Sequence, residues 1–395
     1  MSTNKQYDVA VIGGGVQGVA VAQAVAARGW SVLLLEKHTE LALGTSNKSS
    51  KLIHGGLRYL ESMQFHLVRE CLQEKALLCE LAPDLVKPAR FVIPVYENYS
   101  RSAFWMQLGL LIYRLIAWPA KNPVRGRYKK NEWQEHPALR RQGLLAMLEY
   151  EDAQTDDAAL TRAVWQSAES LGAELRLNSK VKKIKKHDET FEIQLEQEAH
   201  GASVNASVCI NACGPWVNQV SECIEADFVP RRDVDLVQGS HIVLDRPGLS
   251  SCYYLESPDD ARAMFVLPWK GKTMVGTTEL AFSGSPDECV ATTEEVHYLL
   301  KAYNHYFPDM KAGEADIIEC FAGLRVLPKD GSSHNKRSRE TVFLHDPRLP
   351  GYLAIYGGKL TAWRLSAAKV VKEISPWLPA RKVIADTRSL RLRNL

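Results

Sequence analysis

The chain has 395 residues, of which 46% are hydrophobic and 24% are charged, and its formal net charge is +3. That length predicts more than one domain and allows a large buried core. The near balance of charge argues against nucleic acid as the main partner. Because the eight cysteines include no C-x-x-C pair and no secretory signal opens the chain, we expect a protein of the reducing cytoplasm.

Hydrophobic spacing predicts strands alternating with helices along most of the chain. Strands are predicted at 8–12, 31–35, 174–177, 181–184, 191–195, 203–211, 240–244, 263–267, 273–277, 317–321 and 352–356. Helices are predicted at 16–28, 63–81, 103–118, 160–171, 294–306 and 362–374. The apolar stretch 103–118 carries Gln107 and Arg114 and is too short to cross a bilayer, so we expect a peripheral helix.

The first strand, helix and second strand form a βαβ unit with a dinucleotide-binding motif. Its turn, Gly13 to Gly18, fits G-x-G-x-x-G, in which backbone N–H groups and a helix N-terminus face a pyrophosphate. Glu36 follows the second strand, where a carboxylate binds a ribose 2′-hydroxyl and repels a 2′-phosphate. The unit therefore predicts FAD or NAD rather than NADP.

The segment from Thr45 to Tyr59 is dense in hydroxyl groups and glycine. Such a segment can approach a flavin closely and present hydroxyl donors, a cation and a phenol to it. On its residues alone it is equally compatible with an ordinary polar loop.

Taken together, the motifs resemble those of the aerobic-type, quinone-linked FAD-dependent glycerol-3-phosphate dehydrogenases, nearly end to end. The resemblance is carried by segments 13–18, 45–61, 211–216, 239–241, 267–269, 276–278, 323–325 and 357–361. It implies the D-amino-acid-oxidase type of flavoprotein fold, an α/β architecture with a Rossmann-like FAD-binding domain and a substrate domain of mixed or antiparallel sheet plus helices. The FAD-binding domain is expected at 1–90, 150–225 and 320–378, the substrate domain at 91–149 and 226–319, and a short basic tail at 379–395.

The resemblance also implies an activity, the oxidation of sn-glycerol 3-phosphate to dihydroxyacetone phosphate. Hydride passes from C2 to flavin N5 of a non-covalent FAD, and the electrons go on to a quinone. Peripheral contact with the inner face of the cytoplasmic membrane and a homodimer are further possibilities, and no metal site is expected. The alternatives are a related FAD-dependent oxidase or dehydrogenase of another 2-hydroxy acid, polyol phosphate or amine, and a non-catalytic flavoprotein.

Candidate site residues follow from the same resemblance. An alkyl phosphate needs convergent cations, and those expected at the substrate are Arg58, Arg325, Arg339 and Lys359, with Tyr59 orienting it. His241 is the first choice for the base that takes the C2 hydroxyl proton, ahead of His54, and the catalytic set is His241, Arg325 and Arg58. The residues expected at the cofactor are Gly13, Gly15, Val16, Gln17, Gly18, Glu36, Lys37, Thr45, Ser46, Ser49, Ser50, Lys51, Leu52, His54, Val181, Ala212, Gly214, Trp216, Gly358, Lys359, Leu360 and Thr361.

The chain departs from the family in several places. Val326, Cys213 and Trp363 stand where proline, threonine and tyrosine are common, and we expect the helical domain that follows the last glycine-lysine motif in many members to be absent. Membrane contact would then rest on a basic cluster at 121–130 and on Phe104, Trp105, Leu108, Leu111, Ile112 and Leu115. The alternative is a helix that packs on the protein's own core.

Overall fold

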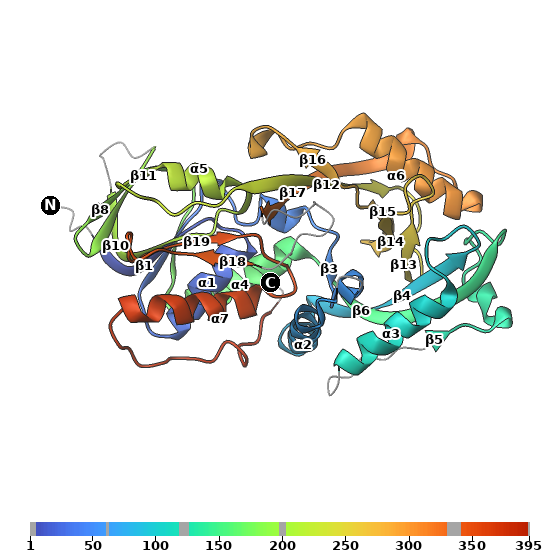
Figure 1. The fold of residues 1–395 in the computed structure, drawn as a ribbon, viewed down its shortest axis with the longest axis horizontal. Helices are drawn as coiled ribbons and strands as arrows, with labels where there is room; N and C mark the ends of the chain where they lie inside the picture. Colours follow the sequence, from blue (N-terminus) through green and yellow to red (C-terminus); the bar gives the residue numbers. More distant parts are fainter. Residues whose placement is uncertain (1–4, 61–62, 118–125, 197–202, 330–340, 394–395) are drawn as a thin grey trace.

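The computed structural model describes residues 5–60, 63–117, 126–196, 203–329 and 341–393, apart from the side chain of Arg58. Within these residues the strands form two sheets, of nine and ten strands. Figure 1 shows them at opposite ends of an elongated molecule, with the long strands β12 and β17 extending between the ends. Arg339 and the basic residues 121–125 lie outside the described residues.

The first sheet is built around the N-terminal strand and is mostly parallel at its centre. Its strands are β1 (Gln6–Ile12), β2 (Val32–Leu35), β7 (Glu174–Arg176), β8 (Val181–His187), β9 (Thr190–Leu195), β10 (Ser203–Asn211), β11 (Ile224–Glu225), β18 (Val342–Leu344) and β19 (Tyr352–Tyr356). β1 pairs in parallel with β2 and β10, and β10 with β19. The carboxyl ends of these strands therefore meet at one edge, where ligands bind in open α/β sheets.

Helices cover the first sheet and complete its core. They are α1 (Val16–Ala27), α4 (Asp157–Ser170), α5 (Val217–Glu222) and α7 (Trp363–Ile374). α1 packs against both α4 and α7, and almost all of its residues are buried, so its apolar surface runs all round rather than along one stripe. After α7 the chain returns along this unit, where Trp30 Nε1 donates to the Pro379 carbonyl and the Leu392 amide donates to the Leu81 carbonyl. The predicted basic tail is thus held to the first unit at Pro379 and to the end of α2 (Phe65–Leu81) at Leu392, while most of the residues between them are exposed.

The second sheet is largely antiparallel. Its strands are β3 (Leu52–Ile53), β4 (Val86–Tyr96), β5 (Gly126–Arg127), β6 (Leu144–Thr155), β12 (Val234–Leu244), β13 (Cys252–Glu256), β14 (Ala263–Trp269), β15 (Lys272–Gly276), β16 (Leu280–Phe282) and β17 (Ile317–Pro328). α6 (Thr293–Tyr306) packs on β12 and β15, while α2 (Phe65–Leu81) and α3 (Ala103–Ala117) pack on each other and on β6.

The longest strand pair fixes the side chains that face the space between the sheets. β12 and β17 pair antiparallel from Val234 opposite Pro328 onward, with Val237 opposite Arg325 and His241 opposite Phe321. Because side chains alternate along a strand, Arg325 and His241 lie on the same face of the sheet. β17 was expected in the FAD-binding domain, and its hydrogen bonds join it to the second sheet. The predicted division into two domains stays a prediction.

The predicted helices are all confirmed, with ends shifted by a few residues. The predicted strands are present as well, and several are longer than expected. Eight strands of the described residues were missed. Six of them lie in the second sheet, namely β3, β4, β5, β6, β13 and β16, and the short strands β11 and β18 lie in the first.

Candidate active site

A cavity of about 540 Å³ lies between the two sheets and is lined by residues from both. Most of the expected site residues reach it. The expected residues that line it are Gly13, Gly15, Val16, Gln17, Glu36, Lys37, Thr45, Ser46, Ser49, Ser50, Leu52, His54, Tyr59, Val181, Ala212, Gly214, Trp216, His241, Arg325, Gly358, Lys359, Leu360 and Thr361.

The glycine turn between β1 and α1 is too crowded for side chains. A Cβ on Gly18 would lie 1.8 Å from the Gly13 carbonyl oxygen, and one on Gly14 would lie 2.5 Å from Leu41 Cδ2. Gly13 has φ +108°, a conformation that favours glycine. α1 begins at Val16 after Gly15, which has no side chain to cap it, and Gly15, Val16 and Gln17 all line the cavity. This helix N-terminus is therefore suited to a pyrophosphate.

Glu36 directly follows β2 and is buried beneath this turn. Its Oε2 accepts from the Gly14 amide at 2.6 Å, and its Oε1 accepts from the His38 amide at 2.9 Å and lies 2.7 Å from His38 Nδ1. A carboxylate offers about four acceptor positions, so the group retains capacity for a ribose hydroxyl after these contacts. The position fits the adenosine ribose of a dinucleotide.

The outer wall of the adenosine end is made by Lys37, Trp216 and Asp287. Lys37 Nζ lies 4.1 Å from the centre of the Trp216 ring and 2.6 Å from Asp287 Oδ1. Burial would raise the pKa of Asp287, but the hydrogen bond from Lys37 and the charges of Lys37 and His38 bring that pKa below its usual value. Asp287 lies beside β16 in the sequence and was not predicted, because nothing in its local sequence marks it.

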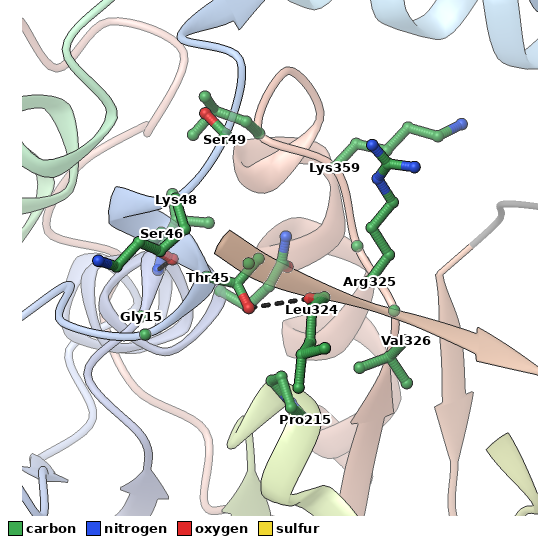
Figure 2. A pocket seen from close by; sticks show the side chains of 18 of the residues that line it. Gly15, Thr45, Ser46, Lys48, Ser49, Pro215, Leu324, Arg325, Val326 and Lys359 are labelled. Carbon is green, nitrogen blue, oxygen red and sulfur yellow. Dashed lines mark hydrogen bonds between the residues drawn. The ribbon is translucent and has the colours of Figure 1, made fainter. Parts of the chain in front are cut away.

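The hydroxyl-rich segment crosses from the turn to the second sheet. Thr45 Oγ1 donates to the Leu324 carbonyl at 2.9 Å, a contact drawn in Figure 2, and Ser46 Oγ accepts from the Val16 amide at 2.9 Å. His54 is held to the loop before α7, because Thr361 Oγ1 is within 3.1 Å of both the His54 amide and its carbonyl oxygen. The segment therefore joins the first unit to β17 and to the chain before α7.

Two of the expected cofactor residues do not line the cavity. Gly18 lies behind the turn, where the absence of a side chain lets α1 approach the Gly13 carbonyl closely. Lys51 is buried away from the cavity, and its Nζ lies 2.6 Å from Asp157 Oδ1. Lys51 is thus a support of the wall rather than part of its lining.

The substrate end of the cavity contains two of the four expected cations. Arg325 Nη2 donates to Thr277 Oγ1 at 3.3 Å, and Lys359 Nζ lies 4.3 Å from the centre of the Tyr59 ring. Both are among the labelled lining residues of Figure 2. Arg58 lies in the short 3-10 helix Leu57–Leu60, and its side chain, like the whole of Arg339, is outside the described residues.

His241 is fixed in the wall next to this end. Its Nε2 lies 2.8 Å from Ser50 Oγ, and its ring stacks on Phe321 at 5.0 Å between centroids. Burial, and then the charges of Arg325 and Lys51, lower the pKa of His241 to about 3. This pKa is well below the near-neutral value that we expected of a base, so the ring is neutral at physiological pH in the free protein.

One wall of the cavity is aromatic, and it was not predicted from the sequence. Phe91 of β4 stacks on Tyr150 of β6 at 5.1 Å and meets Phe265 of β14 edge-on at 6.1 Å, and Tyr254 of β13 completes the group. Three of these strands, β4, β6 and β13, were not predicted, so their inward residues could not be assigned to the site.

The cavity fits FAD on its own geometry: a side-chain-free turn at a helix N-terminus, a buried carboxylate after β2, and the Gln17 amide, whose nitrogen and oxygen have no hydrogen-bond partner within the described residues. Residues 8–364 match the sequence profile of the FAD dependent oxidoreductase family. The chain belongs to that family. The D-amino-acid-oxidase type of fold and the FAD cofactor, both expected from the resemblance, are confirmed.

Curated relatives show which members of the family this FAD-dependent oxidoreductase resembles. It is 34% identical over 390 residues to a glycerol-3-phosphate dehydrogenase of Synechocystis sp., covering 94% of this chain and 70% of the relative. It is also 34% identical over 385 residues to D-erythritol 1-phosphate dehydrogenase of Brucella abortus, covering 96% and 76%. The oxidoreductase therefore belongs with the FAD-dependent dehydrogenases of the glycerol-3-phosphate dehydrogenase type.

Solved structures of similar proteins agree with this family assignment. The glycerol-3-phosphate dehydrogenase of Bacillus halodurans, solved with FAD, superposes with a TM-score of 0.76 at 25% identity, covering 98% of this oxidoreductase and 68% of that chain. The L-α-glycerophosphate oxidase of Mycoplasma pneumoniae, also with FAD bound, gives 0.78 at 20% identity and covers 99% of both chains. At that lower identity the second likeness shows the fold alone.

Proposed function

We propose that this protein oxidises sn-glycerol 3-phosphate to dihydroxyacetone phosphate and passes the electrons to a quinone. The observation that carries the proposal is that Arg325 and Lys359 line the same cavity as the dinucleotide-binding turn. Two cations at the far end of a flavin site suit an oxidisable substrate that carries a phosphate. The names of the relatives at 34% identity support the same substrate class.

The two cations have different parts in binding the substrate. Arg325 is tethered through Thr277, so its guanidinium is held for paired hydrogen bonds to phosphate oxygens. Lys359 rests on the Tyr59 ring and supplies a point charge. With the phosphate fixed at this end, the C2 hydroxyl of a three-carbon substrate is directed back toward the flavin end of the cavity.

His241 is the proposed acceptor of the hydroxyl proton. FAD bound in the cavity supplies the acceptor for the hydride. In the free protein, burial and Arg325 keep the imidazole neutral, which leaves it able to take a proton. A phosphate dianion beside Arg325 offsets that positive charge, so substrate binding itself raises the pKa of His241 toward the range of an effective base.

A longer phosphorylated polyol is the second candidate. It is favoured by the relative that is named for D-erythritol 1-phosphate and by the size of the cavity, about 540 Å³. Amines and 2-hydroxy acids without phosphate are less suited, because Arg325 and Lys359 together would have no anion of matching charge to bind.

Membrane association would give access to the quinone, and α3 is the proposed contact. Its side chains Leu110, Tyr113 and Ala117 are buried, while Phe104 and Trp105 are about two-thirds exposed. The two interpretations of this helix were contact with a membrane and packing on the protein's own core. Both apply to α3, since one face packs on the protein and the other is apolar and exposed. None of the helices in the described residues is long and apolar enough to cross a membrane.

The experiment that tests the substrate is anaerobic reduction of the bound flavin, followed by its loss of absorbance near 450 nm. The panel contains glycerol 3-phosphate, a four-carbon polyol phosphate, glycerol, a 2-hydroxy acid and a small amine. We expect bleaching by the phosphorylated compounds only, with glycerol 3-phosphate the fastest. Bleaching by an unphosphorylated compound at a similar rate would refute the assignment.

A further inference from the structure

A buried ion pair lies directly behind the cavity wall. Lys51 Nζ is 2.6 Å from Asp157 Oδ1 and donates to the Asn47 carbonyl at 2.8 Å, and both charged side chains are almost fully shielded from solvent. Burying such a pair costs desolvation energy that its attraction only roughly repays. The pair is therefore a poor device for stability alone.

Asp157 holds more than the lysine. It is the first residue of α4, where a helix N-terminus favours a negative charge. Its Oδ2 accepts from Ser49 Oγ at 2.6 Å and from the Ser49 amide at 3.1 Å, and the Lys51 amide in turn donates to Ser49 Oγ at 3.1 Å. One carboxylate thus fixes the residues on both sides of Ser50.

Lys51 itself has a left-handed backbone conformation, with φ +60°. A non-glycine residue in this region costs about 1 kcal/mol or more and persists only where its surroundings impose it. The contacts that impose it here are those to Asp157 and Asn47. The result is a turn that presents Ser50, and not its neighbours, to His241.

The imidazole of His241 is held from two directions by this arrangement. Ser50 Oγ lies 2.8 Å from its Nε2, and Phe321 stacks on its ring with an angle of 14° between planes. Lys51 Nζ is 5.1 Å from the centre of the Phe321 ring. The two groups that orient the imidazole are therefore both close to Lys51: Ser50 precedes it in the chain, and the Phe321 ring lies beside its ammonium group.

We propose that Asp157 and Lys51 are positioning residues for His241, acting through Ser50 to fix the orientation and tautomer of the imidazole. The inference rests on the proposed role of His241 as proton acceptor. When Nε2–H donates to Ser50 Oγ, the lone pair of Nδ1 is left for the substrate hydroxyl proton, and Nδ1 has no hydrogen-bond partner within the described residues. Ser50 Oγ can accept that hydrogen, and its fixed place in the turn holds the ring in one orientation.

The same pair has an electrostatic effect with a predictable sign. The charged groups acting on the ring are Arg325 on β17 and Lys51, both of which lower the pKa of His241 in addition to burial. Replacing Lys51 by methionine removes a positive charge and leaves Asp157 unbalanced, which raises that pKa. Replacing Asp157 by asparagine removes a negative charge and does not raise it.

The test compares Asp157→Asn, Lys51→Met and Ser50→Ala with a control at a second buried pair. Arg364 Nε donates to Glu74 at 2.9 Å between α7 and α2, so Glu74→Gln disturbs a pair of similar burial that does not contact His241. The readouts are the flavin reduction rate at saturating substrate, the substrate concentration at half saturation, and the pH profile of the rate. Each variant is measured as FAD-loaded enzyme, with loading checked by its absorption spectrum.

We expect the three test variants to lose about tenfold or more in the saturated rate, since small misplacement of a reacting group is costly, with half saturation changed less than about threefold. Lys51→Met also moves the acidic limb of the pH profile upward, and Asp157→Asn does not. The double variant Ser50→Ala/Asp157→Asn should be no slower than Ser50→Ala, because both changes act through one hydroxyl.

Additive losses in the double variant, or saturated rates equal to that of Glu74→Gln, would overturn the proposal. If Asp157→Asn does not retain FAD, Ser50→Ala and Lys51→Met still give the rate and pH comparisons. The rates are measured with whichever substrate bleaches the wild-type flavin, so failure of glycerol 3-phosphate as substrate is seen separately from failure of this inference.

Discussion

Lys37 and Asp287 form an ion pair across the mouth of the adenosine end of the FAD site, with 2.6 Å between Nζ and Oδ1. One partner follows β2 in the first unit, and the other lies beyond β16 of the second sheet. The lysine also covers the Trp216 ring. The pair thus joins the two halves of the molecule at the wall of the cavity.

Opening this contact should speed the release of FAD. Exposed ion pairs and exposed cation–π contacts are each worth up to about 1 kcal/mol, so Lys37→Met should raise the dissociation rate of FAD about two- to tenfold, with less dependence on salt than in the wild type. The rate is followed by the rise of flavin fluorescence on dilution. The control is Lys301→Met. Lys301 lies on α6, and this change breaks its exposed ion pair with Asp259. Equal release from both variants would contradict the role of Lys37.

Arg325 should determine affinity for a phosphorylated substrate. A hydrogen bond to a charged group contributes about 1.5–3 kcal/mol, so Arg325→Ala should weaken substrate binding by about ten- to a hundredfold, and Arg325→Lys by less because the charge remains. The measurement is the substrate concentration that half-saturates anaerobic flavin reduction. Arg246→Ala, which removes an arginine paired with Asp316 away from the cavity, should leave it unchanged. If Arg325→Ala leaves the half-saturating substrate concentration unchanged, Arg325 does not bind the substrate phosphate.

His241 should make stability depend on pH in a defined window. Its folded-state pKa of about 3 is below the unfolded value of about 6.5, so between these values the unfolded chain binds a proton that the native state excludes. Its contribution to stability is therefore lost progressively as the pH falls through that window.

The measurement is the free energy of unfolding by urea of the apoprotein at pH 7 and pH 5. His241→Gln should reduce the loss between the two pH values, whereas His66→Gln, at an exposed position, should not. The same loss in His241→Gln as in the wild type would show that the buried imidazole does not govern this range.

The exposed apolar face of α3 should bind lipid. Large apolar side chains contribute about 1.5–3 kcal/mol each when buried, so Trp105→Ser/Leu111→Ser should lower co-sedimentation with anionic phosphatidylglycerol vesicles at least about tenfold. Val290→Ser, at another exposed apolar residue, is the matched control. Undiminished binding by the double variant would exclude α3 as the contact.

The N-terminal unit could be predicted from sequence because its constraints are local. The glycines of the turn and the carboxylate after β2 are set within about thirty residues, and the structure brings them together as expected. The long strands β4 and β6 were missed for a physical reason. β4 contains Pro88 and Pro94, which argue against a central strand, and its last six residues are all buried, so no alternation is visible.

These prolines are tolerated because β4 has a partner on its second side only at Phe91 and Val92. That pairing depends on β13, more than 150 residues away in the sequence, and local spacing does not encode it. Because these strands were not predicted, the aromatic wall that they form was not predicted either. The position of Lys51 could not be predicted either, because nothing in its local sequence shows that it pairs with Asp157 and does not line the cavity.

The pairing of β12 with β17 sets the distance between the proposed anion-binding and proton-accepting groups in units of backbone register. Arg325 and His241 cannot approach or separate by loop movement, so a substrate of a different length must be accommodated by the walls around them. One residue inserted into either strand between these pairs would turn one of the two side chains to the opposite face. New specificities in this scaffold should therefore come from changes in the aromatic wall, while the spacing along the ladder stays the same.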